Sequence, residues 1–99
     1  MRLTNDEIAK IRAVVRQTLG ERARVSVFGS RTDDSVRGGD LDLLVQADRA
    51  LANRAAAASR LEAELQLALG DQKIDVILID PTVRQGALHA SARRGAVAL

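Results

Sequence analysis

The order of three segments between residues 40 and 79 limits the folds that this chain can adopt. Residues 40–46 and 73–79 are short apolar runs that alternate like β-strands, whereas residues 48–69 are rich in Ala and Leu. Apolar positions in the middle segment recur every three or four residues, which predicts a long helix ending at Gly70. Two strands joined by such a helix are expected to be parallel neighbours in one sheet.

One stripe of the predicted long helix is expected to pack on the sheet. The stripe comprises Leu51, Ala55, Ala58, Leu61 and Leu65. Leu67 and Leu69 lie outside its centre, where they could contact a partner or a second copy of the chain.

The remaining segments complete a predicted α-β-β-α-β-α order. Residues 4–7 have the form of a capping box, and the apolar pattern after them predicts a first helix that stops at Gly20. Residues 24–28 alternate and predict a strand, and an Asp-Pro pair predicts a last helix over residues 81–94. We therefore expect one domain, residues 1–99, with an α/β (α+β) fold in which helices flank a three-stranded mixed sheet.

The amino-acid composition limits the kind of core, the cysteine chemistry and the membrane association that this chain can have. The apolar share of 46% comes from aliphatic residues, because Phe28 is the only aromatic residue, and the core must therefore be aliphatic. The absence of Cys excludes disulfides, thiolate metal sites and a Cys nucleophile. No apolar run is long enough to span a membrane, and the N-terminal segment has the pattern of a capped helix instead of a leader, so we expect a soluble cytoplasmic protein without membrane contact.

The charge pattern gives little support to nucleic-acid binding. The net charge is +2, and the pI of about 9.9 reflects arginines that titrate at high pH. Proteins that bind single strands place aromatic side chains beside basic ones, and this chain has almost none. Direct nucleic-acid binding is therefore disfavoured.

Three strand carboxylates form the most informative pattern. Alternation places Asp40 and Asp42 on one face of their strand, roughly 6 to 7 Å apart. Asp75 interrupts the apolar run of the following strand, where a charge is costly unless it is paired or bound to metal. Three neighbouring carboxylates could hold two Mg²⁺ ions for displacement at phosphorus. The alternative is that the pair is solvated at a strand edge and that Asp75 lies on the open side of a one-sided sheet.

Gly29-Ser30 follows the predicted strand 24–28 directly. Glycine lets the backbone approach a phosphate closely, and backbone amides together with the Ser30 hydroxyl could donate to phosphate oxygens. A Gly-Ser pair after a strand is also a common turn. Its meaning depends on the aspartates that follow it.

Together these segments resemble a known signature. Val27-Phe28-Gly29-Ser30-Arg31, then Gly39-Asp40-Leu41-Asp42-Leu43-Leu44-Val45, and then Ile74-Asp75-Val76, are similar to the motifs of the polymerase-beta-like nucleotidyltransferase superfamily. Within it the chain resembles the minimal nucleotidyltransferase (MNT) family, which contains the MntA-type antitoxins. The resemblance implies that Gly29 and Ser30 hold nucleotide phosphates and that Asp40, Asp42 and Asp75 are both catalytic and metal-binding. Arg31 and Gly39 are added as candidate nucleotide contacts.

The resemblance is incomplete in the stretch between the first two motifs. The commoner pattern has an Arg-Gly pair after Gly-Ser and a Ser before the first aspartate, where this chain has Thr32-Asp33-Asp34 and Gly38-Gly39. The seating and choice of nucleotide depend on this stretch. His89 and the arginines of the last helix, Arg84, Arg93 and Arg94, have the pattern of surface side chains. An EF-hand is excluded, because the residues after Asp42 lack further oxygen ligands and the required glycine.

The resemblance implies Mg²⁺-dependent transfer of AMP from ATP to a hydroxyl group. Small members of the family lack the additional substrate-binding domain of larger ones, so the acceptor is expected on a partner, namely a tyrosine of a HEPN-domain toxin. Two alternatives remain open. One is an antitoxin-like binding module without transfer activity, and the other is a nucleotidyltransferase subunit that acts on a small molecule.

Overall fold

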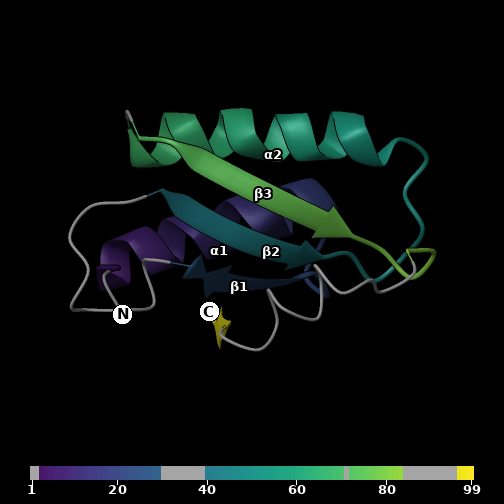
Figure 1. Ribbon diagram of the computed structural model, residues 1–99, viewed down its shortest axis with the longest axis horizontal. Helices are drawn as coiled ribbons and strands as arrows, with labels where there is room; N and C mark the ends of the chain where they lie inside the picture. The colour runs from purple at the N-terminus through teal and green to yellow at the C-terminus, as the bar shows by residue number, and fades with distance from the viewer. Residues whose placement is uncertain (1–2, 30–39, 71, 84–95) are drawn as a thin grey trace.

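The computed structural model describes residues 3–29, 40–70, 72–83 and 96–99. Among these described residues, two helices cover one face of a four-stranded mixed sheet, so the chain is α+β as predicted. Figure 1 shows α1 behind β2 and β3, and α2 alongside β3. The elements in chain order are α1 (Asn5–Leu19), β1 (Arg24–Phe28), β2 (Leu41–Gln46), α2 (Arg54–Leu69), β3 (Ile74–Ile79) and β4 (Val97–Ala98).

The sheet has four strands in the order β3-β2-β1-β4, and the prediction of three was wrong. β2 and β3 are parallel neighbours, as the helical crossover between them predicted. β1 is antiparallel to β2 on one side and to β4 on the other. β4 has only two residues, Val97 and Ala98, which is too short for alternation to be detected in the sequence.

The first helix follows its sequence signal closely. The Thr4 hydroxyl accepts a hydrogen bond from the Glu7 amide, and the Glu7 carboxylate accepts one from the Thr4 amide, both at 3.1 Å. This reciprocal pair satisfies two amides that no helical carbonyl can reach. The predicted capping box is therefore confirmed.

The second helix begins at Arg54, six residues later than residue 48, where the Ala-rich composition placed its start. Asn53 is the N-cap, and its side-chain oxygen accepts a hydrogen bond from the Ala56 amide at 3.0 Å. Asn at this position stops the helix from extending backwards, because its side chain replaces the missing carbonyl. Ala and Leu before Asn53 carry no boundary signal of their own.

Asp80 does not begin a helix within the described residues. Residues 81–83 form a turn, and the rest of the predicted helix lies outside the described residues. The Asp80 carboxylate accepts hydrogen bonds from the Thr82 amide and the Leu51 amide, both at 2.9 Å, and from the Thr82 hydroxyl at 2.5 Å. It therefore ties the end of β3 to the segment that leads into α2.

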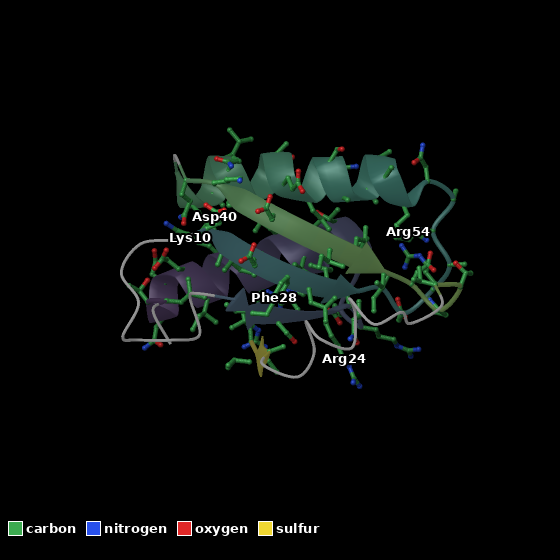
Figure 2. The ribbon with its side chains drawn as sticks, viewed as in Figure 1. Lys10, Arg24, Phe28, Asp40 and Arg54 are labelled. Carbon is green, nitrogen blue, oxygen red and sulfur yellow. The ribbon has the colours of Figure 1, made fainter. Side chains whose placement is uncertain are left out.

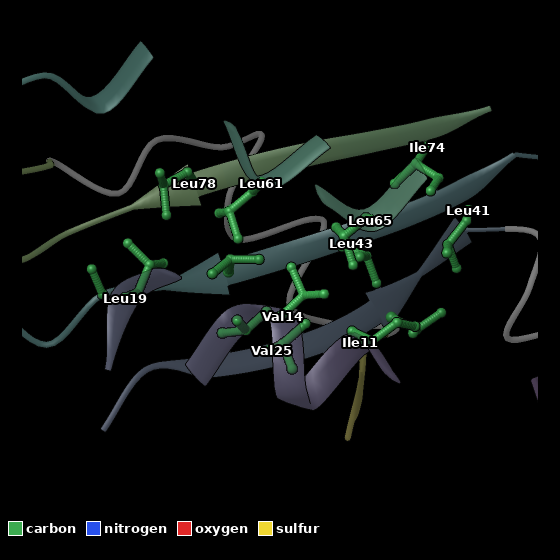
Figure 3. Close-up of a cluster of buried hydrophobic side chains, with 14 residues drawn as sticks. Ile11, Val14, Leu19, Val25, Leu41, Leu43, Leu61, Leu65, Ile74 and Leu78 are labelled. Carbon is green, nitrogen blue, oxygen red and sulfur yellow. The ribbon is translucent and has the colours of Figure 1, made fainter. Parts of the chain in front are cut away.

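The core lies between the helices and the sheet (Figure 3). It is aliphatic, as the composition required. Nine large aliphatic side chains are fully buried: Ile11, Val15, Val27, Leu41, Leu43, Leu44, Val45, Leu61 and Leu65. In the described part of the chain, neither helix is both long and apolar enough to cross a membrane.

The stripe predicted for α2 is correct only in part. Leu61 and Leu65 are fully buried and Ala58 is half-buried. Leu51 is half-buried but precedes the helix, and Ala55, in its first turn, is exposed. Leu67 is 82% exposed, as expected, whereas Leu69 packs against the core.

Candidate functional site

The predicted carboxylates Asp42 and Asp75 face each other across two parallel strands. The pairing of β2 with β3 places Asp42 directly beside Asp75, and the pairing of β1 with β2 places Phe28 on the other side of Asp42. Neighbouring strands are about 4.8 Å apart, so Phe28, Asp42 and Asp75 form one row across the sheet, which we call the carboxylate row. Strand alternation directs this row away from the face on which the helices pack.

Asp40 lies two residues before Asp42 and therefore on the same face. It immediately precedes β2, and the Leu41 amide donates to the Lys73 carbonyl at 3.0 Å, which joins the starts of β2 and β3. Asp40 and Asp42 are half-buried, whereas Asp75 is exposed. The structure therefore brings all three predicted carboxylates to one end of the sheet.

Packing of α2 on β3 supports the position of Asp75. The Glu62 carboxylate of α2 accepts a hydrogen bond from the Val76 amide at 3.3 Å. The Gln66 side-chain amide donates to the Gln72 carbonyl at 2.6 Å. These two bonds fasten the start of β3 to the helix on either side of Asp75.

Gly29 directly follows the last residue of β1 and lies against the Asp42 side chain. Its φ is +77°, a conformation that side chains rarely adopt. A Cβ atom at Gly29 would lie 2.5 Å from Oδ2 of Asp42, closer than any stable contact. The backbone conformation therefore favours glycine here, and a side chain at this position would also displace the Asp42 carboxylate.

The Asp42 carboxylate is repelled by the negative charges of both Asp40 and Asp75. Burial raises the pKa of the Asp42 carboxyl above its ordinary value of 3.8, and the negative charges of Asp75 and Asp40 raise it further. Lys73 acts in the opposite direction and lowers the pKa of Asp42. The ionised cluster is thus unfavourable by itself, and a cation beside it would relieve the repulsion.

Lys73 was missed by reasoning from the sequence. Its Nζ lies 3.4 Å from Oδ2 of Asp40, with the Lys73 side chain 70% exposed. The signal was available, because Lys73 precedes Asp75 by two residues and therefore shares its face. A lysine at a strand start is common, however, and only the parallel pairing shows which carboxylate it reaches.

Other predicted site residues fall outside the described residues. These are Ser30, Arg31 and Gly39, which were predicted to contact nucleotide, and His89, Arg84, Arg93 and Arg94, which were predicted to be surface residues. Their roles stay predictions.

The candidate oxygen donors for Mg²⁺ are the carboxylates of Asp40, Asp42 and Asp75. Within the part of the chain that the structure describes, no three His, Asp or Glu side chains are already gathered closely enough to form a metal site. The donors are nevertheless of the right chemical kind, since Mg²⁺ prefers carboxylate oxygens and completes its shell with water and substrate phosphates. The raised pKa of Asp42 also marks where an added positive charge would be most stabilising. The carboxylates therefore suit the ion in chemical kind, while in this arrangement they do not form a closed metal site.

Comparison with known proteins gives a likeness of fold. No protein-family model matches the sequence, and no curated protein matches it. The structure is similar to a chain of a solved complex, described as a tri-AMPylated Shewanella oneidensis HEPN toxin in complex with MNT antitoxin. The TM-score is 0.64 with 24% sequence identity, and the match covers 93% of this chain and 67% of that chain.

Proposed function

We propose that this chain is a Mg²⁺-dependent nucleotidyltransferase of the polymerase-beta-like fold that moves AMP from ATP to a hydroxyl group. The observation that carries the proposal is the strand register, which sets Asp42 beside Asp75 and Asp40 on the same face. A second support is Gly29, whose backbone approaches the same carboxylate row. No structural need of the fold explains three carboxylates in one place, because their repulsion opposes folding.

Each residue has a role in this proposal. Asp40 and Asp42 would hold Mg²⁺ together with Asp75, and Mg²⁺ supplies charge neutralisation at the phosphates and a lower pKa for the attacking hydroxyl. The Gly29-Ser30 segment would receive the phosphates. The exposed carboxylate of Asp75 would accept the proton of the acceptor hydroxyl. The hydroxyl oxygen forms a bond to the α-phosphorus, the bond to the β-phosphate oxygen breaks, and pyrophosphate leaves.

The proposed acceptor is a tyrosine hydroxyl on a HEPN-domain toxin, which would make this chain the antitoxin of the pair. The fold likeness to a chain of a HEPN–MNT complex with an AMPylated toxin supports this choice. The exposure of the Asp75 side chain also suits a macromolecular acceptor. The second candidate is a binding module that blocks the toxin by contact alone.

A thermal-shift titration tests the nucleotide site. Mg²⁺ and ATP together should raise the melting temperature by more than the sum of their separate effects, because the metal joins the carboxylates to the phosphates. Asp42→Asn should remove this joint effect. Asp48→Asn is the matched control, since it removes the same charge from an exposed position beyond the other end of β2. Additive shifts in the unmodified protein would count against the proposal.

Transfer is tested by mixing the chain with a HEPN-domain protein, ATP and Mg²⁺ and measuring the intact mass of the partner. The unmodified chain should add the mass of AMP, whereas Asp42→Asn should form the complex without adding mass. If both proteins bind and neither adds mass, the binding-module function replaces the transferase. If neither protein binds, the HEPN partner is wrong.

A further inference from the structure

A second site candidate lies at the end of the sheet away from the carboxylates. An open cavity of about 550 Å³ is lined by residues of α1, the start of β1 and the end of the chain at Leu99. Three of its lining residues are arginines: Arg12 and Arg16 from α1, and Arg24 from β1. We call this feature the arginine cavity. Its volume is within the usual range for a binding site.

The arginine cavity is spatially separate from the carboxylate row. Arg24 is the first residue of β1 and Phe28 is the last, and a strand of this length separates them by about 13 Å. Figure 2 shows Arg24 and Asp40 toward opposite ends of the strands. The arginine cavity is therefore not part of the proposed nucleotide site.

The charges in the arginine cavity are not balanced from within. Its lining includes Glu21 and the terminal residue Leu99, which together supply two carboxylates against the three guanidinium groups. The ion pairs between described residues join Lys10 to Asp6 and Lys73 to Asp40, so neither of them uses these arginines. The positive groups of the lining still outnumber the negative ones, and an anionic ligand would offset that excess.

The lining indicates which anion fits. Guanidinium groups form paired hydrogen bonds with carboxylates and with phosphates, so charge alone does not decide. The floor is aliphatic, with Val15, Val25 and Leu99 among the lining residues, and this surface can pack against the methylene groups of an acidic side chain. No aromatic residue is among the described lining residues, so a nucleobase would find no stacking surface there. These features favour a protein segment over a nucleic acid.

We propose that the arginine cavity binds an acidic segment of a protein partner, with Arg12, Arg16 and Arg24 contacting its carboxylates. This inference does not depend on the transferase activity. It assigns the two ends of the sheet to different tasks, with acidic groups at one end and a basic contact surface at the other.

The test uses an oligoglutamate peptide as the probe and NMR amide shifts of the full chain as the readout. Shifts should concentrate at the amides of Arg16, Arg24 and Val25 and weaken as salt is raised. Replacing Arg12, Arg16 and Arg24 together by Gln should weaken binding about tenfold, the loss expected from three exposed ion pairs. All three side chains are exposed, so the variant should fold normally.

A matched control separates a built site from general charge attraction. Arg49, Arg54 and Arg60 are also exposed but lie outside the arginine cavity, and replacing them by Gln changes the net charge equally. This control should bind the peptide nearly as the unmodified chain does. Equal weakening in both variants, or shifts spread over the whole surface, would overturn the proposal.

Two further probes distinguish the source of the anion. Pyrophosphate and oligothymidylate carry phosphate charge without carboxylates, and both should bind more weakly than the peptide. If either one binds at the arginine cavity while oligoglutamate does not, the partner is not an acidic protein segment and the proposal fails.

Discussion

Substitution of Gly29 by Ala separates the stability of the fold from the geometry of the carboxylate row. The new methyl group would occupy a backbone with φ of +77° and would begin 2.5 Å from Oδ2 of Asp42. Holding a residue other than glycine in such a conformation costs about 1–3 kcal/mol. The contact itself is relieved at little further cost, because the clashing atom is the tip of a side chain that can rotate.

Gly70→Ala provides the control. Gly70 has φ of +88°, and a Cβ atom there would meet nothing within 4 Å. Both variants should therefore lose about 1–3 kcal/mol of unfolding free energy, which is roughly 5–20 °C in melting temperature for a domain of this size. Only Gly29→Ala displaces the Asp42 carboxylate.

The decisive assay is calorimetric titration with ATP and Mg²⁺ at a temperature where both variants are folded. Gly29→Ala should lose at least tenfold in affinity, whereas Gly70→Ala should bind like the unmodified chain. Unchanged binding by Gly29→Ala would refute the argument that Gly29 and Asp42 share one site. Equal losses in both variants would show that the effect is general destabilisation.

Three further predictions concern stability. Leu61→Ala should lower the unfolding free energy in urea by about 2–5 kcal/mol because Leu61 is fully buried, whereas Leu67→Ala, at an 82% exposed position, should change it by less than about 0.5 kcal/mol. The hydrogen bond from the Thr82 side chain holds the pKa of Asp80 below 3.8, so Asp80→Asn should destabilise the protein at neutral pH. The difference in unfolding free energy between the variant and the unmodified protein should shrink as the pH falls through the folded-state pKa of Asp80. A difference that is independent of pH would contradict this. Burial and neighbouring carboxylates raise the pKa of Asp42, so Asp42→Asn should stabilise the metal-free protein at pH 7, with the gain vanishing below about pH 3.8; calorimetric melting at several pH values would show it.

Much of the fold could be predicted because its signals are local. The capping box at Thr4 and the alternation of Leu41, Leu43 and Val45 are each complete within a few residues. The neighbouring positions of Asp42 and Asp75 also followed from the sequence, since a helix between two strands favours their parallel pairing. The carboxylate row could thus be predicted before any coordinates.

Most of the errors in the predicted fold and site involve contacts between residues that are distant in the sequence. β4 exists because Val97 and Ala98 pair with β1, far away in sequence. The start of α2 is set by Asn53, a local N-cap signal that the Ala-rich pattern obscured, whereas the Leu51 amide before it is held by the distant Asp80 carboxylate. Lys73 reaches Asp40 only through the pairing of β2 with β3.

The register between β2 and β3 decides on which face of the sheet the side chains of the carboxylate row lie. Because side chains alternate, a shift of β3 by one residue would send Asp75 to the helix side and expose Ile74 and Leu78 in its place. The next pair on the same face is Leu44 and Ile77, but Leu44 is fully buried, so a carboxylate pair is accommodated only at the Asp42 and Asp75 positions. Burial of the aliphatic core therefore fixes the strand register that places the two aspartates side by side. An insertion of one residue inside either strand would separate them even if the chain still folded.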